Sequence, residues 1–215
     1  MLATNDQLKL MVDTFHRGTC LKYKKGEFII RPGESPPGVF YIESGLVKAY
    51  DITKYGEENL LIIRKSGEFL GLTWAVTGDD RQIIYEALSP SVVWLVSRSK
   101  FKAYLQKHPQ AAMPLLDIAT EMLRIHSIRI LNLEYRTVRE RLISFLLDNA
   151  LRFGKKTKDG MLIDVPLRHQ DIASSINSSR ETTSREMAYL ERKGFISNSQ
   201  LHITLIDTPA LRSYL

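Results

Sequence analysis

A short charged run near the C-terminal end has the side-chain types and the spacing needed to read DNA bases. In the sequence RETTSRE, residues 180–186, two arginines flank a glutamate. An arginine can donate two hydrogen bonds to O6 and N7 of guanine, and a carboxylate can accept one from N4 of cytosine. Arg180, Glu181 and Arg185 therefore suit adjacent G·C pairs. Glu181 and Arg185 are four residues apart, so on a helix they share a face and can orient one another.

The same run has a plainer interpretation, a solvated helix face that carries an ion pair. Charged helix faces are common, so residue types alone do not separate the two interpretations. The flanking sequence favours base reading, because it predicts the elements that would present the run to DNA.

The residues before the run predict a first short helix and a tight turn. Ile172 and Ile176 mark the buried face of this helix, and Ala173 supplies a small side chain where a second helix must cross closely. Asn177 can adopt the left-handed backbone conformation that a tight turn between helices needs.

The residues after the turn predict a second helix that carries the charged run on its outer face. Ser178 or Ser179 can cap its N-terminus. Met187 and Leu190 fall on its buried face, which leaves Ser184 and the charged side chains pointing outward. Two helices joined in this way are typical of helix-turn-helix units, in which the second helix is the recognition helix.

The N-terminal half predicts a short helix followed by an all-β unit. Within residues 1–18, apolar side chains recur at a spacing of three and four, as on one face of a helix. From Leu21 to about Val96, short β-branched and aromatic runs alternate with glycine and proline turns at roughly 8 to 12 residue spacing, which is typical of a sandwich or barrel.

From Lys100 the helical period returns, with a short helix up to His108 and a long helix from about Gln110 to Phe153. One apolar seam of the long helix repeats every seven residues and consists of Leu116, Ala119, Leu123, His126, Ile130 and Leu133. A second stripe beside it consists of Leu115, Ile118, Met122 and Ile125. Two interpretations stay open: a coiled-coil seam for a partner helix beside a stripe for the β unit, or one wide core-facing stripe in a monomer.

The remaining residues predict a linker and a small α/β unit. Lys155–Gly160 is rich in lysine and glycine and is expected to be a loop. A strand at Met161–Val165, the helix pair ending near Lys193, and a hairpin ending in Leu201–Ile206 follow it.

Composition excludes several classes of protein and leaves a weak preference for an anionic partner. The 215 residues are 44% hydrophobic and 25% charged, as in ordinary globular domains rather than disordered, collagen-like or disulfide-rich chains. The formal charge of +6 favours nucleic acid only slightly. A lone Cys20 cannot close an intramolecular disulfide and suits a reducing cytoplasm. The longest apolar run, Leu60–Ile63, is too short for a membrane span, so we expect a soluble cytoplasmic protein.

Three segments together resemble the Crp/Fnr family of bacterial transcription regulators, over nearly the whole chain and in the family's order. SSRETTSREMAYLERKGFI closely resembles the family's C-terminal motif, whose common form is S-R-E-T-V-S-R-E-L, then L, then G-L-I. YKKGEFIIRPGE, VFYIESGLVKAY and KSGEFLG resemble its cyclic-nucleotide-binding β-roll. The long helix resembles its dimerisation helix.

The resemblance implies an α+β fold in three parts. Residues 1–109 would form an N-terminal β-roll, a jelly roll like those that bind cyclic nucleotides. Residues 110–137 would form a long dimerisation helix and hinge, and residues 138–215 a C-terminal winged helix-turn-helix. It also implies a homodimer that binds a two-fold symmetric promoter site, and a surface for RNA polymerase, for which Lys155–Gly160 lies at the matching place.

The resemblance further implies which residues touch DNA. In the cyclic-AMP-receptor branch, the positions that match Arg180, Glu181 and Arg185 read a TGTGA-like half-site. The positions that match Gln170, Ser179 and Thr182 touch phosphates, which fixes the register of the protein on DNA without reading sequence. With the outward Ser184, the expected DNA-binding residues are Gln170, Ser179, Arg180, Glu181, Thr182, Ser184 and Arg185. Two departures, Thr183 for the usual valine and a longer segment at Leu162–Leu167, are expected to shift docking slightly.

The effector pocket is where the family pattern fails. Cyclic-AMP binders of the family carry G-E-(L/I)-(A/G) and then R-(S/T)-A, with the glutamate on the ribose hydroxyl and the arginine on the cyclic phosphate. Here Gly71 and Arg81 are present, but Leu72 replaces the carboxylate and Gln82 replaces the hydroxyl. An unpaired buried sugar hydroxyl costs about 1–3 kcal/mol. We therefore expect weak or no cyclic AMP binding.

Two helix residues complete the candidate pocket. Ser127 matches a position that reaches the adenine in cyclic-AMP binders, and His126 lies beside it. The plainer interpretation makes His126 a hydrogen-bonded core histidine, Ser127 a tolerated residue and Arg81 a loop ion-pair partner. Gating by another small effector and independence of any effector both stay open, and the alternative function is cyclic AMP binding through a divergent pocket.

No cofactor is expected. An iron-sulfur member of the family needs four cysteines, and this chain has one. Haem ligation by His16, Cys20, His108 or His126 is disfavoured, because scattered single histidines and cysteines are usually structural.

The sequence disfavours two rival classes of function, an enzyme and a cyclic-nucleotide module that acts on another protein. The sequence contains no H-E-x-x-H, no G-x-S-x-G and no phosphate-cradling glycine loop, so nothing favours an enzyme. A cyclic-nucleotide module that regulates another protein would need no recognition helix, and residues 168–196 argue against it.

Overall fold

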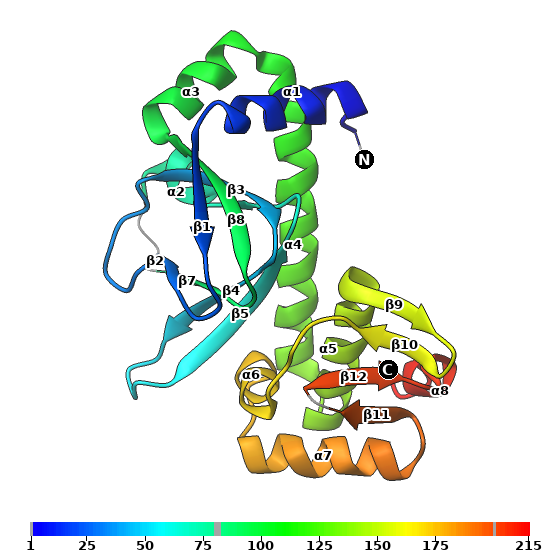
Figure 1. Ribbon diagram of the computed structural model, residues 1–215. Helices are drawn as coiled ribbons and strands as arrows, with labels where there is room; N and C mark the ends of the chain where they lie inside the picture. The colour runs from blue at the N-terminus through cyan, green and yellow to red at the C-terminus, as the bar shows by residue number, and fades with distance from the viewer. Residues whose placement is uncertain (1, 80–82, 200) are drawn as a thin grey trace. The chain divides into compact units, whose positions relative to one another are not determined.

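The computed structural model describes residues 2–79, 83–199 and 201–215, and these fall into two compact units (Figure 1). The N-terminal unit comprises the chain up to Asp51 together with Leu61–Ile125. The C-terminal unit comprises Ile52–Leu60 together with His126–Leu215. The unit boundary therefore falls inside a helix and inside a β-hairpin, and each unit is described by itself.

The β-rich part forms two four-stranded antiparallel sheets, which confirms the predicted all-β segment. The first sheet has the order β1 (Thr19–Tyr23), β8 (Ser91–Ser97), β3 (Gly38–Ser44) and β6 (Phe69–Leu70). The second has the order β2 (Phe28–Ile30), β7 (Ile84–Ala87), β4 (Leu46–Ile52) and β5 (Glu58–Lys65). Inward side chains from both sheets, among them Phe40, Ile42, Val47 and Val93, share one apolar cluster. This cluster is the core of a β-roll.

Three helices accompany the sheets of the N-terminal unit: α1 (Asn5–His16), α2 (Leu72–Thr77) and α3 (Arg98–Lys107). Helix α1 begins at a capping box between Thr4 and Gln7 and buries Met11 and Phe15, as the apolar spacing predicts. Phe15 joins Phe69 and Phe101 in a second, aromatic cluster. Helix α2 lies within the segment predicted as strands and turns, so that part of the prediction is wrong.

The predicted helix from Gln110 to Phe153 is broken, so the expectation of one continuous helix is wrong. A 3-10 turn at Pro109–Ala111 leads into α4 (Ala112–Tyr135), and α5 (Val138–Phe153) follows. Between them Thr137 has an extended backbone and a side chain that accepts a hydrogen bond from the backbone N–H of Glu140. The Glu140 carboxylate in turn accepts a hydrogen bond from the Thr137 backbone N–H. This capping box starts a new helix.

The two apolar stripes of α4 have different environments. Leu115 and Ile118 of the second stripe pack against the aromatic cluster, and Met122 and Ile125 pack against the core of the β-roll. The described residues leave the heptad seam uncovered, since exposed fractions reach 45% at Leu116, 66% at Leu123 and 56% at Ile130. The interpretation as one wide core-facing stripe is therefore wrong.

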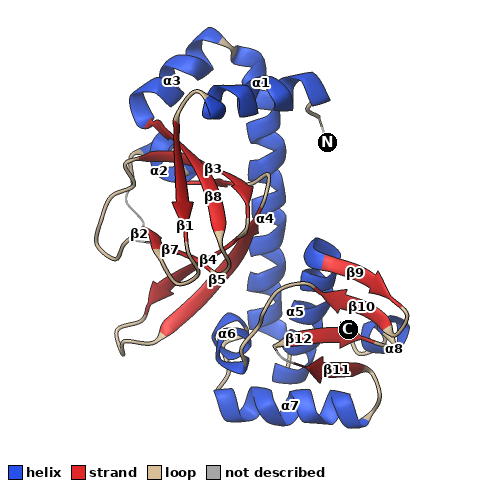
Figure 2. Cartoon of the chain, in the orientation of Figure 1, coloured by secondary structure: helices blue, strands red, loops and turns tan. Residues whose placement is uncertain are grey.

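The C-terminal unit surrounds α5 with a small sheet and short helices (Figure 2). Its further elements are β9 (Gly154–Thr157), β10 (Gly160–Ile163), α6 (His169–Ser175), α7 (Arg180–Arg192), β11 (Ile196–Ser199), β12 (His202–Leu205) and α8 (Thr208–Arg212). The sheet order is β11-β12-β10-β9. Leu142, Ile143 and Leu146 of α5 are fully buried and form part of its core.

The prediction that the lysine-rich segment Lys155–Gly160 is a loop is wrong. The segment contains most of strand β9 and the turn into β10. Lys156 pairs with Met161 and Lys155 pairs with Leu162 in the antiparallel register of β9 and β10. Strand β9 lies at the edge of the sheet, and all four of its residues are exposed. Lysines are common on edge strands because their charge opposes pairing with another chain, so the composition that suggested a loop suits this strand.

Candidate DNA-binding interface

The turn between α6 and α7 has the predicted geometry. Asn177 has φ = 51°, in the left-handed region. The N–H of Ser178 donates to the carbonyl of Ala173 at 2.9 Å and closes the turn. Of the two serines expected as caps, Ser179 is the N-cap of α7, and its hydroxyl accepts from the N–H of Thr182 at 3.1 Å. Helix-turn-helix geometry at this place is confirmed.

The inner faces of the two helices are buried as the sequence predicts. Ala173 is fully buried, as are Ile172 and Leu190, and Met187 is nearly so. Thr183 is also fully buried, and its hydroxyl has no hydrogen-bond partner in the described part of the chain. Valine is the usual residue of the resembling motif at this position, so the threonine adds an unsatisfied hydroxyl to an apolar contact.

The three residues expected to read bases lie together and exposed at the start of α7. Arg180 and Glu181 occupy its first two positions, and Arg185 follows one turn later. The ion pair expected between Glu181 and Arg185 is not formed within the described residues, nor does Arg180 form one there. All three side chains therefore extend into solvent, and Glu181 lies where the helix dipole favours an acidic group.

The residues expected to touch phosphates surround the same helix end. Gln170 and Ser179 are exposed and Thr182 is half-buried. The Ser179 hydroxyl donates to the Thr182 hydroxyl at 3.1 Å. The backbone N–H groups at a helix N-terminus bind phosphate oxygens well, so this end of α7 can dock on the DNA backbone.

Ser184 differs from the rest of the expected set because its hydroxyl contacts a side chain of the other helix, α6. Its Oγ lies 2.8 Å from Nδ1 of His169, the first residue of α6. The other ring nitrogen, Nε2, lies 3.1 Å from the side-chain amide nitrogen of Asn198 on β11. His169 and Asn198 are not among the predicted site residues, because no local pattern marks contacts between residues so far apart in the chain.

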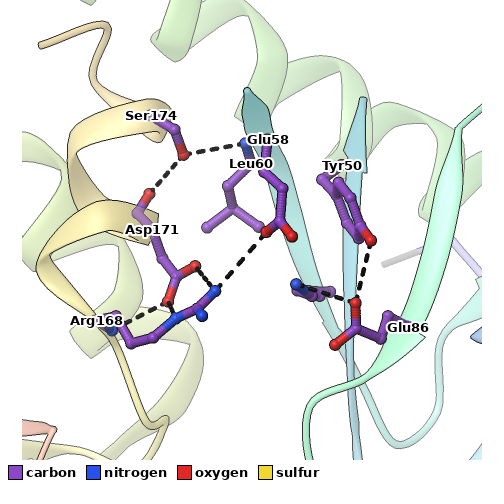
Figure 3. A network of polar contacts seen from close by, with 8 residues as sticks. Tyr50, Glu58, Leu60, Glu86, Arg168, Asp171 and Ser174 are labelled. Carbon is purple, nitrogen blue, oxygen red and sulfur yellow. Dashed lines mark hydrogen bonds and ion pairs between the residues drawn. The ribbon is translucent and has the colours of Figure 1, made fainter. Parts of the chain in front are cut away.

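Helix α6 is held by a polar network that the sequence also did not reveal (Figure 3). The Arg168 guanidinium forms two hydrogen bonds with the Asp171 carboxylate, at 2.9 and 2.8 Å, and lies 3.7 Å from Glu58. The Ser174 hydroxyl accepts from the backbone N–H of Leu60 at 3.2 Å. Glu58 and Leu60 belong to the segment Ile52–Leu60 of the same C-terminal unit.

An arginine of α5 contacts two side chains of α7. The Arg139 guanidinium bonds the Glu186 carboxylate at 2.6 Å and stacks 3.8 Å from the centre of the Tyr189 ring. The hydrogen bond to Glu186 raises the pKa of Arg139 above its ordinary value. Both partners are half-buried residues of α7, so this contact positions the helix through side chains other than the exposed Arg180, Glu181 and Arg185.

Gly71 and Leu72 of the candidate effector pocket belong to the N-terminal unit, and His126 and Ser127 belong to the C-terminal unit. Gly71 has φ = 75° and precedes α2, and a Cβ on it would lie 2.8 Å from the Gly38 carbonyl oxygen. Leu72 packs against the aromatic cluster. His126 and Ser127 are exposed and belong to the C-terminal unit, so the interpretation of His126 as a core histidine is wrong for this chain. Arg81 and Gln82 lie outside the described residues.

The described residues offer neither a metal site nor a membrane-spanning helix. They contain no cluster of three or more histidine, cysteine, aspartate or glutamate side chains able to hold a metal ion. No helix within them is both long and apolar enough to cross a membrane. Cys20, a haem-ligand candidate, is exposed.

Two protein-family models match the chain in the order of its units. Residues 20–108 match the cyclic nucleotide-binding domain, and residues 140–214 match the Crp-like helix-turn-helix domain. The chain is 29% identical over 191 residues to the global nitrogen regulator of Synechocystis sp., covering 88% of this chain and 85% of that protein. It is also 29% identical to the cAMP-activated global transcriptional regulator CRP of Salmonella typhimurium, covering 82% and 84%.

Solved structures show the same fold. FixK2 from Bradyrhizobium japonicum superimposes with a TM-score of 0.78 at 25% identity, covering 91% of this chain and 96% of that one. A CooA mutant from Carboxydothermus hydrogenoformans gives a TM-score of 0.80 at 19% identity, covering 100% and 97%. With the helix-turn-helix geometry and both family matches, these similarities establish that the chain is a DNA-binding transcription regulator of the Crp/Fnr family.

Proposed function

We propose that this regulator binds, as a homodimer, a two-fold symmetric promoter site with TGTGA-like half-sites. The observation that carries the proposal is the joint exposure of Arg180, Glu181 and Arg185 on the first two turns of α7. Each arginine can take a guanine and the glutamate a cytosine. Because these side chains form no ion pair within the described residues, base contacts do not first have to break one.

The exposed seam of α4 supports the homodimer. Leu116, Leu123 and Ile130 repeat every seven residues and stay exposed in the part of the chain that the structure describes. Heptad-spaced leucine and isoleucine side chains pack against an equivalent helix as knobs into holes. A two-fold dimer would present two α7 helices to half-sites one helical turn apart.

We also propose that a small effector other than cyclic AMP controls DNA binding, or that the protein binds DNA without any effector. Leu72 cannot accept a hydrogen bond from a ribose hydroxyl, which supports weak or no cyclic AMP binding. We further propose that the protein needs no cofactor and works in the cytoplasm, where promoter DNA and RNA polymerase are found. The exposed β9–β10 turn is the proposed polymerase surface.

Binding to a symmetric TGTGA duplex, followed by fluorescence anisotropy, tests the proposal. Arg180→Ala and Arg185→Ala should each weaken binding by about 1–3 kcal/mol, because each removes a bidentate base contact. Arg192→Ala, an exposed arginine at the other end of α7, is the matched control and should change affinity little. Binding should also fall steeply with salt. If both arginine variants bind as tightly as the parent protein, the proposal is wrong.

A further inference from the structure

A single imidazole connects three elements of the C-terminal unit. His169 begins α6, and its ring contacts Ser184 of the recognition helix α7 and Asn198 of β11, at 2.8 and 3.1 Å. Strands β11 and β12 form a hairpin, the wing, in which Asn198 pairs with Ile203. The half-buried His169 side chain is thus the junction of the first helix, the recognition helix and the wing.

The hydrogen-bond chemistry of this junction uses both ring nitrogens. The amide nitrogen of Asn198 is a donor, so Nε2 of His169 must accept. The ring proton then lies on Nδ1, which donates to the Ser184 hydroxyl oxygen. With both nitrogens engaged inside the protein, neither is available for a phosphate. The Ser184 Oγ is likewise engaged, although this residue is among the predicted DNA contacts.

Asn198 is also fixed from its other side. Its backbone N–H donates to the Glu191 carboxylate, near the C-terminal end of α7, at 3.1 Å. Ser184 lies one turn after Arg180 and directly before Arg185, so a bond to its side chain restrains the rotation of the reading face. The wing and the reading face are therefore held in one mutual orientation through His169.

We propose that His169 is a positioning residue for DNA recognition, which sets the orientation of the wing relative to the recognition helix before DNA binds. This inference rests on the proposed DNA-binding function but concerns residues outside the base-reading set. Without the imidazole, the wing and α7 would have to be ordered when DNA binds, and the ordering would lower affinity.

A double-mutant cycle in DNA binding tests the proposal. His169→Ala and Asn198→Ala should each weaken binding to the TGTGA duplex about 3- to 30-fold, and the double variant should be no weaker than the weaker single, because both remove one linkage. His169→Gln should recover part of the loss. Ser197→Ala, at the exposed neighbour on β11, is the matched control.

The salt dependence of binding separates positioning from direct phosphate contact. If His169 acts through Ser184 and Asn198, the slope of log affinity against log salt should be the same in His169→Ala as in the parent protein. A slope smaller by about one would show a lost phosphate contact and overturn the proposal. Additive single effects, or parental affinity in His169→Ala, would overturn it as well.

Hydrogen exchange in the DNA-free protein keeps this test independent of the proposed DNA site. Wing amides at 196–199 and 202–205 should exchange several-fold faster in His169→Ala and in Asn198→Ala than in the parent protein. In His169→Gln they should exchange more slowly than in His169→Ala. Unchanged exchange in both alanine variants would contradict the proposal even if the duplex is bound. If the parent protein itself does not bind the TGTGA duplex, that result would contradict only the proposed function.

Discussion

The recognition helix and the candidate effector pocket match the family pattern to different degrees. On α7, Arg180, Glu181 and Arg185 are all present and lie exposed together. In the pocket, Leu72 replaces a carboxylate, and His126 and Ser127 fall in a different unit from Gly71. Each kind of base pair presents its own fixed pattern of donors and acceptors in the major groove, so the side-chain types of α7 nearly determine what it can read. A pocket depends on shape and on several segments, so its ligand does not follow from residue types.

The largest effect is expected at the dimer seam, on which two-fold DNA reading depends. Leu123→Asp places a charge on the most exposed leucine of the seam, where a partner helix would bury it. The variant should be monomeric by analytical ultracentrifugation and should bind the symmetric duplex more than about 100-fold more weakly, because two linked half-sites become one. Leu151→Asp, an equally exposed leucine of α5, is the control. A dimeric Leu123→Asp protein would contradict the seam assignment.

A smaller effect is expected at the attachment of α7 to α5. Arg139→Ala removes the hydrogen bond to Glu186 and the stacking on Tyr189. Since the arginine is partly exposed, we expect a loss of about 1 kcal/mol in the free energy of unfolding, measured with urea. Arg139→Lys should recover little of it, because an ammonium group cannot stack in the same way. Equal stability of the parent and Arg139→Ala proteins would show that other contacts position α7.

Thr183 allows a gain in stability that leaves DNA reading unchanged. Thr183→Val removes a buried hydroxyl that has no partner in the described part of the chain, and it keeps the side-chain volume. The free energy of unfolding should rise by about 1 kcal/mol. Base preference should stay the same, since the side chain faces the core rather than DNA. A destabilised variant would mean that the hydroxyl has a partner.

The smallest effect is expected from cyclic AMP itself. Calorimetry should detect no saturable binding tighter than about 1 mM, or about −4 kcal/mol, because no carboxylate takes the place of Leu72. The same titration with Arg81→Ala is the control. Tight binding that depends on Arg81 would remove the contrast between the two regions and restore the cyclic AMP alternative.

Much of the fold was predictable from local patterns, and the errors have local physical causes. The α6–α7 turn was predictable because Asn177 and Ser179 carry the conformational and capping preferences that it needs. Apolar periodicity does not show the break before α5, because it continues across it, although Thr137 and Glu140 form the readable pattern of a capping box. The lysine-rich β9 was taken for a loop because its polarity comes from its edge position.

The candidate site was predictable only where one short segment contains it. The reading face of α7 lies within six residues, so its composition identifies it. His169 contacts Ser184, which lies 15 residues further along the chain, and Asn198, which lies 29 residues further along. Only the folded structure brings these residues together. Likewise, the Arg168–Glu58 contact has no signal in the sequence around either residue.

Selection of bound DNA from a random pool tests the central claim most directly, because it assumes no site. The parent protein should enrich two inverted TGTGA-like half-sites one helical turn apart, and Arg185→Ala should lose the preference for a guanine in each half-site. Enrichment of an unrelated or asymmetric sequence, or of the same motif by Arg185→Ala, would contradict the assignment of base reading to Arg180, Glu181 and Arg185.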